Sequence, residues 1–97
     1  MAGQQYIGTA RWGTTQNFSY TGTAGVVTNP FGSGTYKVRI IVTTAAYVKV
    51  GDGTPTATAN DVYMAAGAAE YVSVTPGQKV SAVQVSSGGT LQVTECA

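Results

Sequence analysis

The chain has 97 residues, of which 9% are charged, and it carries one cysteine, no histidine and a formal net charge of +1. Soluble domains usually have about 25% charged residues, so hydroxyl groups, small side chains and backbone must cover most of this surface. A net charge this close to zero gives no long-range attraction to nucleic acid or to an anionic membrane, and the lack of histidine excludes Ser–His and Cys–His catalytic pairs. We expect a protein that packs against partners and is not an enzyme.

Length and cysteine content set the expected organisation. About 100 residues are enough for one hydrophobic core and leave no room for a second domain. Cys96 has no cysteine partner in the chain, and we expect it to stay a free thiol in a reducing compartment. The N-terminus lacks the basic stretch and the apolar run of a secretory signal, so we expect synthesis in the cytoplasm without export by a signal of its own.

Residues 1–14 are predicted to form an arm that precedes a β-domain of residues 15–97. Tyr, Trp and Arg are the residue types most enriched at binding hot spots, and the arm places them among Gly, Gln, Thr and Ala. The candidate partner interface comprises Tyr6, Ile7, Arg11 and Trp12. The alternative is that Trp12 plugs one end of the core of its own subunit.

Strand patterns begin after the arm. Residues 16–20 and 25–28 are strand candidates, and residues 29–34 are rich in Gly, Asn, Pro and Ser, which favour turns. Residues 36–42 give the clearest strand, because apolar and polar side chains alternate with the period of two expected when one face is buried. This segment therefore predicts a strand with one buried face.

The second half continues with short strands and turns. Residues 46–50 also alternate, so we expect a hairpin through residues 43–45, and the glycines of residues 51–53 are expected to end the strand. Residues 54–61 have no alternation and contain a proline that removes a backbone donor, so we expect an excursion over the surface. Three further strands are expected at residues 70–74, 79–85 and 90–94.

No segment is predicted to be helical, because Gly67 interrupts the only stretch of helix-favouring composition, residues 64–69. About seven or eight short strands favour one small antiparallel β-sandwich or barrel, either jelly-roll or immunoglobulin-like. Open sheets have edges with unpaired N–H and C=O groups, which monomers often guard with charged side chains. With so few charges, we expect a homo-oligomer or docking on a larger surface. The alternative is a monomer whose loops cover the edges.

The sequence lacks the residue patterns that are typical of catalytic, metal or nucleotide sites. The four acidic residues, two of which flank one loop, show no catalytic spacing, and a calcium site needs about six to eight oxygen ligands. They are Asp52, Asp61, Glu70 and Glu95. The glycines of residues 32–34 and 51–53 lack the helix and lysine of a phosphate-binding loop. Five aromatic residues lack the basic groove of a single-strand binder and are expected to serve core and interface packing: Phe18, Phe31, Tyr47, Tyr63 and Tyr71. We expect no cofactor, no metal and no small-molecule substrate.

A series of short motifs runs through the C-terminal two thirds of the chain, at residues 36–42, 47–51, 54–58, 70–72, 74–80 and 89–95. In this order they resemble small virion proteins encoded by tailed phages and prophages. The resemblance implies a head decoration or cement protein, a small all-β module that binds the outer capsid surface and bridges major capsid subunits as a dimer or trimer. It assigns no functional residue to this chain, and the first third of the sequence shows no match.

Two function hypotheses follow. A decoration protein would be made in the host cytoplasm and act on the capsid exterior through buried area and hydrogen bonds; removal of residues 1–14, or Trp12→Ala, would then weaken capsid binding and leave the β fold intact. The second hypothesis is a tail-fibre or adhesin-type module that binds a receptor or carbohydrate with residues 54–61. Copy number separates the two, since a decoration protein is expected at hundreds of copies per virion and a fibre module at far fewer.

Overall fold

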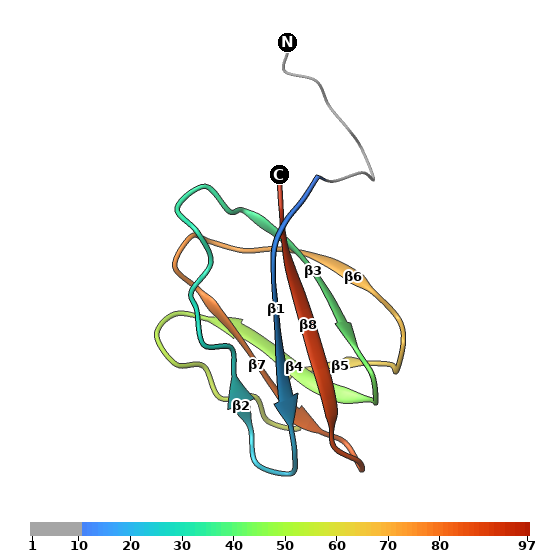
Figure 1. Ribbon diagram of the computed structural model, residues 1–97. Helices are drawn as coiled ribbons and strands as arrows, with labels where there is room; N and C mark the ends of the chain where they lie inside the picture. Colours follow the sequence, from blue (N-terminus) through green and yellow to red (C-terminus); the bar gives the residue numbers. More distant parts are fainter. Residues whose placement is uncertain (1–10) are drawn as a thin grey trace.

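The computed structural model describes residues 11–97, and all regular structure in this range is β-strand (Figure 1). Two four-stranded antiparallel sheets pack face to face, with strand order β1-β8-β3-β6 in the first sheet and β2-β7-β4-β5 in the second. The strands are β1 (Trp12–Tyr20), β2 (Gly25–Val26), β3 (Lys37–Val42), β4 (Ala46–Gly51), β5 (Val62–Met64), β6 (Glu70–Ser73), β7 (Lys79–Gln84) and β8 (Gly89–Cys96). The predicted all-β sandwich is confirmed.

The strand order is that of an eight-stranded jelly roll. The chain changes sheet at every connection except the one between β4 and β5, which are neighbours in the second sheet. An immunoglobulin-like sandwich would place its first two strands side by side, whereas here β1 pairs with β8. Of the two topologies left open by the sequence, the structure therefore has the jelly roll, a double-sheet fold built from two Greek keys.

The predicted hairpin through residues 43–45 is wrong. β3 ends in the first sheet and β4 begins in the second, so these residues cross between the sheets. The crossing is fixed from inside, because the Tyr20 hydroxyl donates to the Thr44 carbonyl oxygen (2.6 Å) and accepts from the Thr44 N–H (3.2 Å). Alternation identifies a strand and its buried face, but it carries no information about which neighbour the strand pairs with.

The other strand predictions differ in their outcomes. The predicted strands at residues 36–42, 46–50, 70–74, 79–85 and 90–94 are confirmed as β3, β4, β6, β7 and β8, with small shifts at their ends. β1 extends further toward the N-terminus than expected, and β2 is shorter. β5 was missed, because only three residues form it and two of them, Val62 and Tyr63, are exposed.

The surface excursion of residues 54–61 covers part of the second sheet. Pro55 and Ala57 are buried, and the Ala57 N–H donates to the Ser81 hydroxyl oxygen (2.9 Å). Ser81 in turn donates to the Gly25 carbonyl oxygen (2.6 Å), so a polar residue on the outer face of β7 is fully buried and fully bonded. This loop shields one half of the outer face and leaves the other half open.

The core fills the space between the two sheets. In β3 the inward side chains are Val38, Ile40 and Val42, which alternate with half-exposed outward side chains. Tyr20, Phe31, Leu91 and several valines complete one continuous cluster. Burial of large apolar side chains at alternate positions on both sheets is what stabilises the sandwich.

The boundary between the predicted arm and the predicted domain falls inside a strand. β1 begins at Trp12, so the last three residues of the predicted arm belong to the first sheet. The backbone of Arg11 already pairs with Ala97, because each N–H donates to the other's carbonyl oxygen at 2.9 Å. Backbone pairing therefore includes the last four residues of the predicted arm, residues 11–14. Residues 1–10 lie outside the described residues.

Tyr20→Phe is expected to lower the free energy of unfolding by about 1–3 kcal/mol, since it removes a buried hydroxyl and leaves the Thr44 backbone groups without their partner. Urea unfolding followed by circular dichroism measures the loss. Tyr36→Phe is the matched control, because the Tyr36 side chain is 65% exposed. Equal midpoints for the two variants would contradict a structural role for the Tyr20 hydroxyl.

Candidate interaction site

The predicted interface residues are only partly within the described range. Tyr6 and Ile7 lie outside it, and Arg11 and Trp12 are both exposed. Trp12 is 68% exposed, so it does not plug the core of its own subunit, and that alternative is wrong. Its neighbour across the β1–β8 ladder is Cys96, at one end of the first sheet. The two predicted residues that are described thus stand on the surface beside the C-terminus.

Polar side chains dominate the outer face of the first sheet. Thr15 and Thr94 share a hydrogen bond between their hydroxyls (3.0 Å), and the Gln92 amide donates to Asn17 Oδ1 (3.2 Å). Arg39 lies opposite both Thr94 and Tyr71 in the ladders on its two sides. The outward polar side chains of β1 and β8 therefore bond to one another.

The second sheet carries an uncovered apolar surface, here named the tyrosine patch: Ala45, Tyr47, Tyr63, Val83 and Val85. The ladder places Val83, Tyr47 and Tyr63 in one row across β7, β4 and β5. The two tyrosine rings meet edge to face, with centroids 6.1 Å apart. One step along, the Val85 N–H donates to the Ala45 carbonyl oxygen (3.2 Å). Five apolar side chains from three segments thus form one surface.

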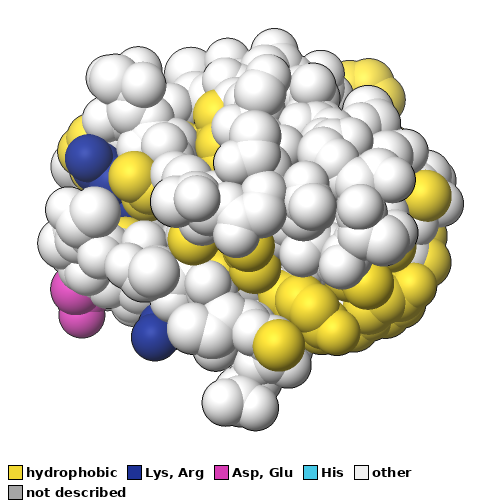
Figure 2. Space-filling view, turned by 90° about the horizontal axis from the view of Figure 1, so that it is seen from below, with side chains coloured by type: hydrophobic (Ala, Val, Ile, Leu, Met, Phe, Trp, Pro, Cys, Tyr) yellow, Lys and Arg dark blue, Asp and Glu magenta, His cyan; other side chains and the backbone are white. Residues whose placement is uncertain are grey.

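The tyrosine patch lies at the half of the sheet that residues 54–61 leave open. Tyr63 is 55% exposed and Val85 is 40% exposed. Figure 2 looks onto the end of the molecule where β1 ends and shows hydrophobic side chains gathered along one side, with the charged side chains of this view on the opposite side. A contiguous apolar surface of this kind is a candidate interaction site.

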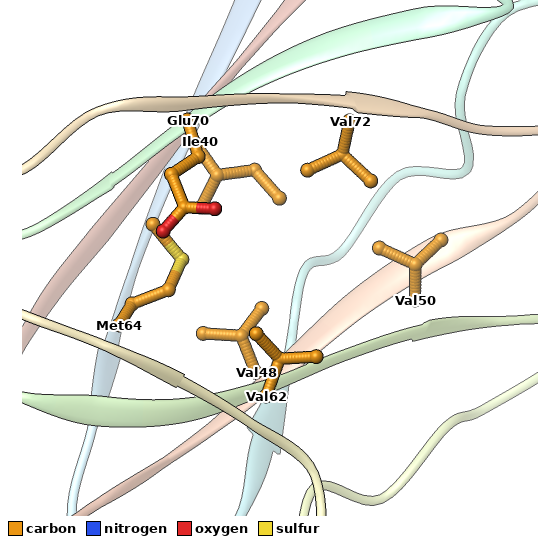
Figure 3. A pocket seen from close by; sticks show the side chains of 7 residues that line it. All are labelled: Ile40, Val48, Val50, Val62, Met64, Glu70 and Val72. Carbon is orange, nitrogen blue, oxygen red and sulfur yellow. The ribbon is translucent and has the colours of Figure 1, made fainter.

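The sandwich is open along the side where β5 and β6 form the edges of the two sheets. A groove of about 230 Å³ enters there between the sheets. Seven side chains line it: Ile40, Val48, Val50, Val62, Met64, Glu70 and Val72. In Figure 3, Val72 of β6 faces Val50 of β4 across the space, and the Glu70 side chain reaches toward Met64. The opposite side is closed, because Gln16 and Asn29 exchange two hydrogen bonds (2.9 and 3.0 Å) between β1 and the chain after β2.

The acidic side chains serve local structure. The Asp61 carboxylate accepts from the Thr58 N–H (2.7 Å) and hydroxyl (3.2 Å) within its own loop. The Glu95 carboxylate accepts from the Gly32 N–H (3.0 Å) and from the Thr35 hydroxyl. Among residues 11–97, no three His, Cys, Asp or Glu side chains lie close enough together to hold a metal ion. The carboxylates of Asp61 and Glu95 are thus engaged in hydrogen bonds to nearby loops.

Sequence reasoning named two of the patch residues but not the patch. Tyr47 and Tyr63 were expected to serve core and interface packing, and the structure places both on one outer face. The groove was missed, because Val62 and Met64 belong to the unrecognised β5. The sequence signal for the patch was Val83 and Val85, two apolar residues at alternate positions just after the buried Val80 and Ala82.

No helix in the described part of the chain is long and apolar enough to cross a membrane. Comparison of the chain with protein-family models, with curated proteins and with solved structures finds no match. The surfaces described above are therefore the basis on which a function is assigned.

Proposed function

We propose that the chain is a head decoration, or cement, protein of a tailed phage, which binds the outer surface of the assembled capsid and stabilises contacts between major capsid subunits. The observation that carries the proposal is the tyrosine patch, an uncharged apolar surface with two paired aromatic rings on a rigid sheet. Jelly rolls are used in viral capsid proteins, although a fold alone does not specify a function. The resemblance of the C-terminal motifs to small virion proteins supports the same assignment.

Capsid binding would depend on the contact area that is buried and on avidity. Tyrosine supplies much apolar contact area together with a hydroxyl, and it is enriched at binding hot spots. A capsid repeats the same receiving surface many times, so several weak contacts by one oligomer add up to firm attachment. Because the patch contains no charged side chain, its contribution to binding should depend little on salt.

The proposal includes no reaction, cofactor, nucleic acid, membrane or small-molecule substrate. The protein would be made in the host cytoplasm and would reach the capsid exterior after the shell has assembled. The exposed Trp12 and Arg11 lie at one end of the first sheet, on a different face from the tyrosine patch. They are proposed as a second contact, because a bridging protein has to touch more than one capsid subunit.

Tyr63→Asp is expected to weaken binding to purified heads about 30-fold, the loss that corresponds to a hot-spot residue worth roughly 2 kcal/mol. Occupancy is measured by quantitative gel after incubation with heads that lack the protein. Tyr36→Asp is the matched control, because it adds the same charge at a tyrosine that is 65% exposed and lies outside the patch. Equal occupancy by both variants would exclude the tyrosine patch as the contact.

One further variant tests the second contact on the same heads, because Trp12→Ala should weaken binding. Deletion of residues 1–10 tests the rest of the predicted arm, and it replaces the deletion of residues 1–14 because Trp12–Thr14 are part of β1. A count of copies per virion tests the assignment itself. Hundreds of copies on the head support a decoration protein, whereas a few copies on the tail would favour the receptor- or carbohydrate-binding module instead.

A further inference from the structure

We propose that the groove between β5 and β6 receives Tyr6 and Ile7 from a second copy of the chain, so that the protein forms a homo-oligomer by exchange of N-terminal segments. The inference goes beyond capsid binding and does not depend on it, because the groove and the segment belong to the same sequence. Four observations carry it: the lining of the groove, the free strand edges beside it, the composition of residues 1–10, and the distance that the segment can span.

The groove is suited to apolar side chains and poorly suited to water. Its volume is about 230 Å³, and roughly 10–15 Å³ of free space is enough to hold one water, which also needs two to four polar partners. Six of the seven lining side chains are apolar, and only Glu70 can accept hydrogen bonds. This lining offers water few hydrogen-bond partners on the protein, so apolar side chains would gain free energy by displacing water from it.

Two free backbone edges flank the groove. β5 pairs only with β4, and β6 pairs only with β3, so each presents an unpaired side within the described part of the chain. Glu70 is the one charged residue in these two strands, and neither has the lysine that often guards an edge. An extended segment can bind such an edge through its backbone and place alternate side chains in the adjoining groove.

Residues 1–10 match this receiving surface. They contain no charged side chain, and Tyr6 and Ile7 form their one pair of adjacent large apolar residues. Gly, Gln, Thr and Ala surround the pair, so it would enter the groove without burying a charge. Successive side chains of an extended segment point to opposite sides, so one of the two can enter the groove while the other points away from it.

The length of the linker indicates a second copy. Ile7 is four residues from Arg11, so the two Cα atoms are at most about 14 Å apart. Arg11 pairs with Ala97 at the β1 position of the first sheet, whereas the mouth of the groove lies at β6, three strand spacings of about 4.8 Å away and about 5 Å deeper between the sheets. Val72 of the groove lies opposite Val38 and therefore level with Glu95, two residues along β8 from Ala97. These offsets combine to about 17 Å, which exceeds the reach of Ile7. Tyr6 could span that distance only along a straight line, which the core between the sheets blocks.

The test is sedimentation of the full-length protein with two substitutions. Ile7→Asp places a charge on the segment, and Val62→Asp places one at the rim of the groove, at a side chain that is 63% exposed and whose change should not unfold the protein. We expect the wild-type protein to be a dimer or a larger closed oligomer and each variant to dissociate at least about tenfold more readily. Tyr36→Asp is the control and should sediment like the wild type.

Mixing the two variants tests the exchange itself. Ile7→Asp keeps an intact groove and Val62→Asp keeps an intact segment, so the mixture should contain a hetero-oligomer that neither variant forms alone. A wild-type protein that stays monomeric, a Val62→Asp variant with unchanged mass, or a mixture that behaves as two separate monomers would each overturn the inference. Loss of the oligomer would reduce avidity for the capsid, so the Tyr63→Asp variant, which keeps residues 1–10 and the groove intact, measures the capsid contact separately.

Discussion

Gly89→Ala is expected to lower the free energy of unfolding by about 3 kcal/mol, because the added methyl group has no space at the start of β8. A Cβ atom there would meet the Thr44 hydroxyl oxygen, the Tyr20 hydroxyl at 2.6 Å and the Thr43 hydroxyl oxygen at 2.7 Å. These oxygens are fixed by hydrogen bonds, since Tyr20 donates to the Thr44 carbonyl oxygen and Thr43 accepts from the Thr90 N–H (2.9 Å). The side chains cannot move aside without losing those bonds.

Urea unfolding of Gly89→Ala and Gly34→Ala gives a matched comparison. A Cβ at Gly34 would meet no atom within 4 Å, and Gly34 is not among the described glycines with positive φ, so this control should change stability by about 0.5 kcal/mol or less. The double variant Tyr20→Phe with Gly89→Ala should lose less stability than the sum of the two single losses, because Tyr20→Phe removes one of the three oxygens that the added methyl group meets. Additive losses, or equal midpoints for the two alanine variants, would contradict the clash.

The strands could be predicted from the sequence, and their partners could not. Val38, Ile40 and Val42 alternate with polar or less buried residues, so β3 and its buried face were visible in the pattern. The crossing at Thr44 depends on the Tyr20 hydroxyl, which comes from β1, and both β2 and β3 lie between the two residues in the chain. No local pattern encodes a contact of this kind. The sequence therefore predicted a hairpin where the structure has a crossing between the sheets.

The candidate surfaces were harder to predict from the sequence than the fold was. Tyr47 and Tyr63 form one row only because β4 and β5 are neighbours, and β5 is too short to show alternation. The groove combines side chains of both sheets, such as Val72 and Val50, so it depends on sandwich packing. Trp12 is a different case. Its residue type was compatible both with an exposed contact and with a core plug, and the exposed fraction of its side chain excludes the plug.

Glu95→Ala is expected to cost about 2–3 kcal/mol of stability, because it removes the acceptor for two donors. Glu95 lies opposite Val38 in the ladder, and its carboxylate binds the Gly32 N–H and the hydroxyl of the buried Thr35. These bonds close one end of the sandwich, where Phe31 is also held by backbone hydrogen bonds to the turn between β6 and β7. Without the carboxylate, a buried hydroxyl loses its acceptor.

Glu95→Gln separates the hydrogen bonds from the size of the side chain. Its amide oxygen can still accept from both donors, so we expect a smaller loss, about 1 kcal/mol, whereas Asp52→Ala on an exposed loop should be neutral. Trp12 lines the same hollow as Thr35 and Glu95 and is the single tryptophan of the chain, so its emission reports this end directly. Equal losses of stability for Glu95→Ala and Glu95→Gln would mean that the carboxylate acts through its charge. A larger loss for Glu95→Ala, together with altered Trp12 emission, would link the closure of this end to the proposed second contact.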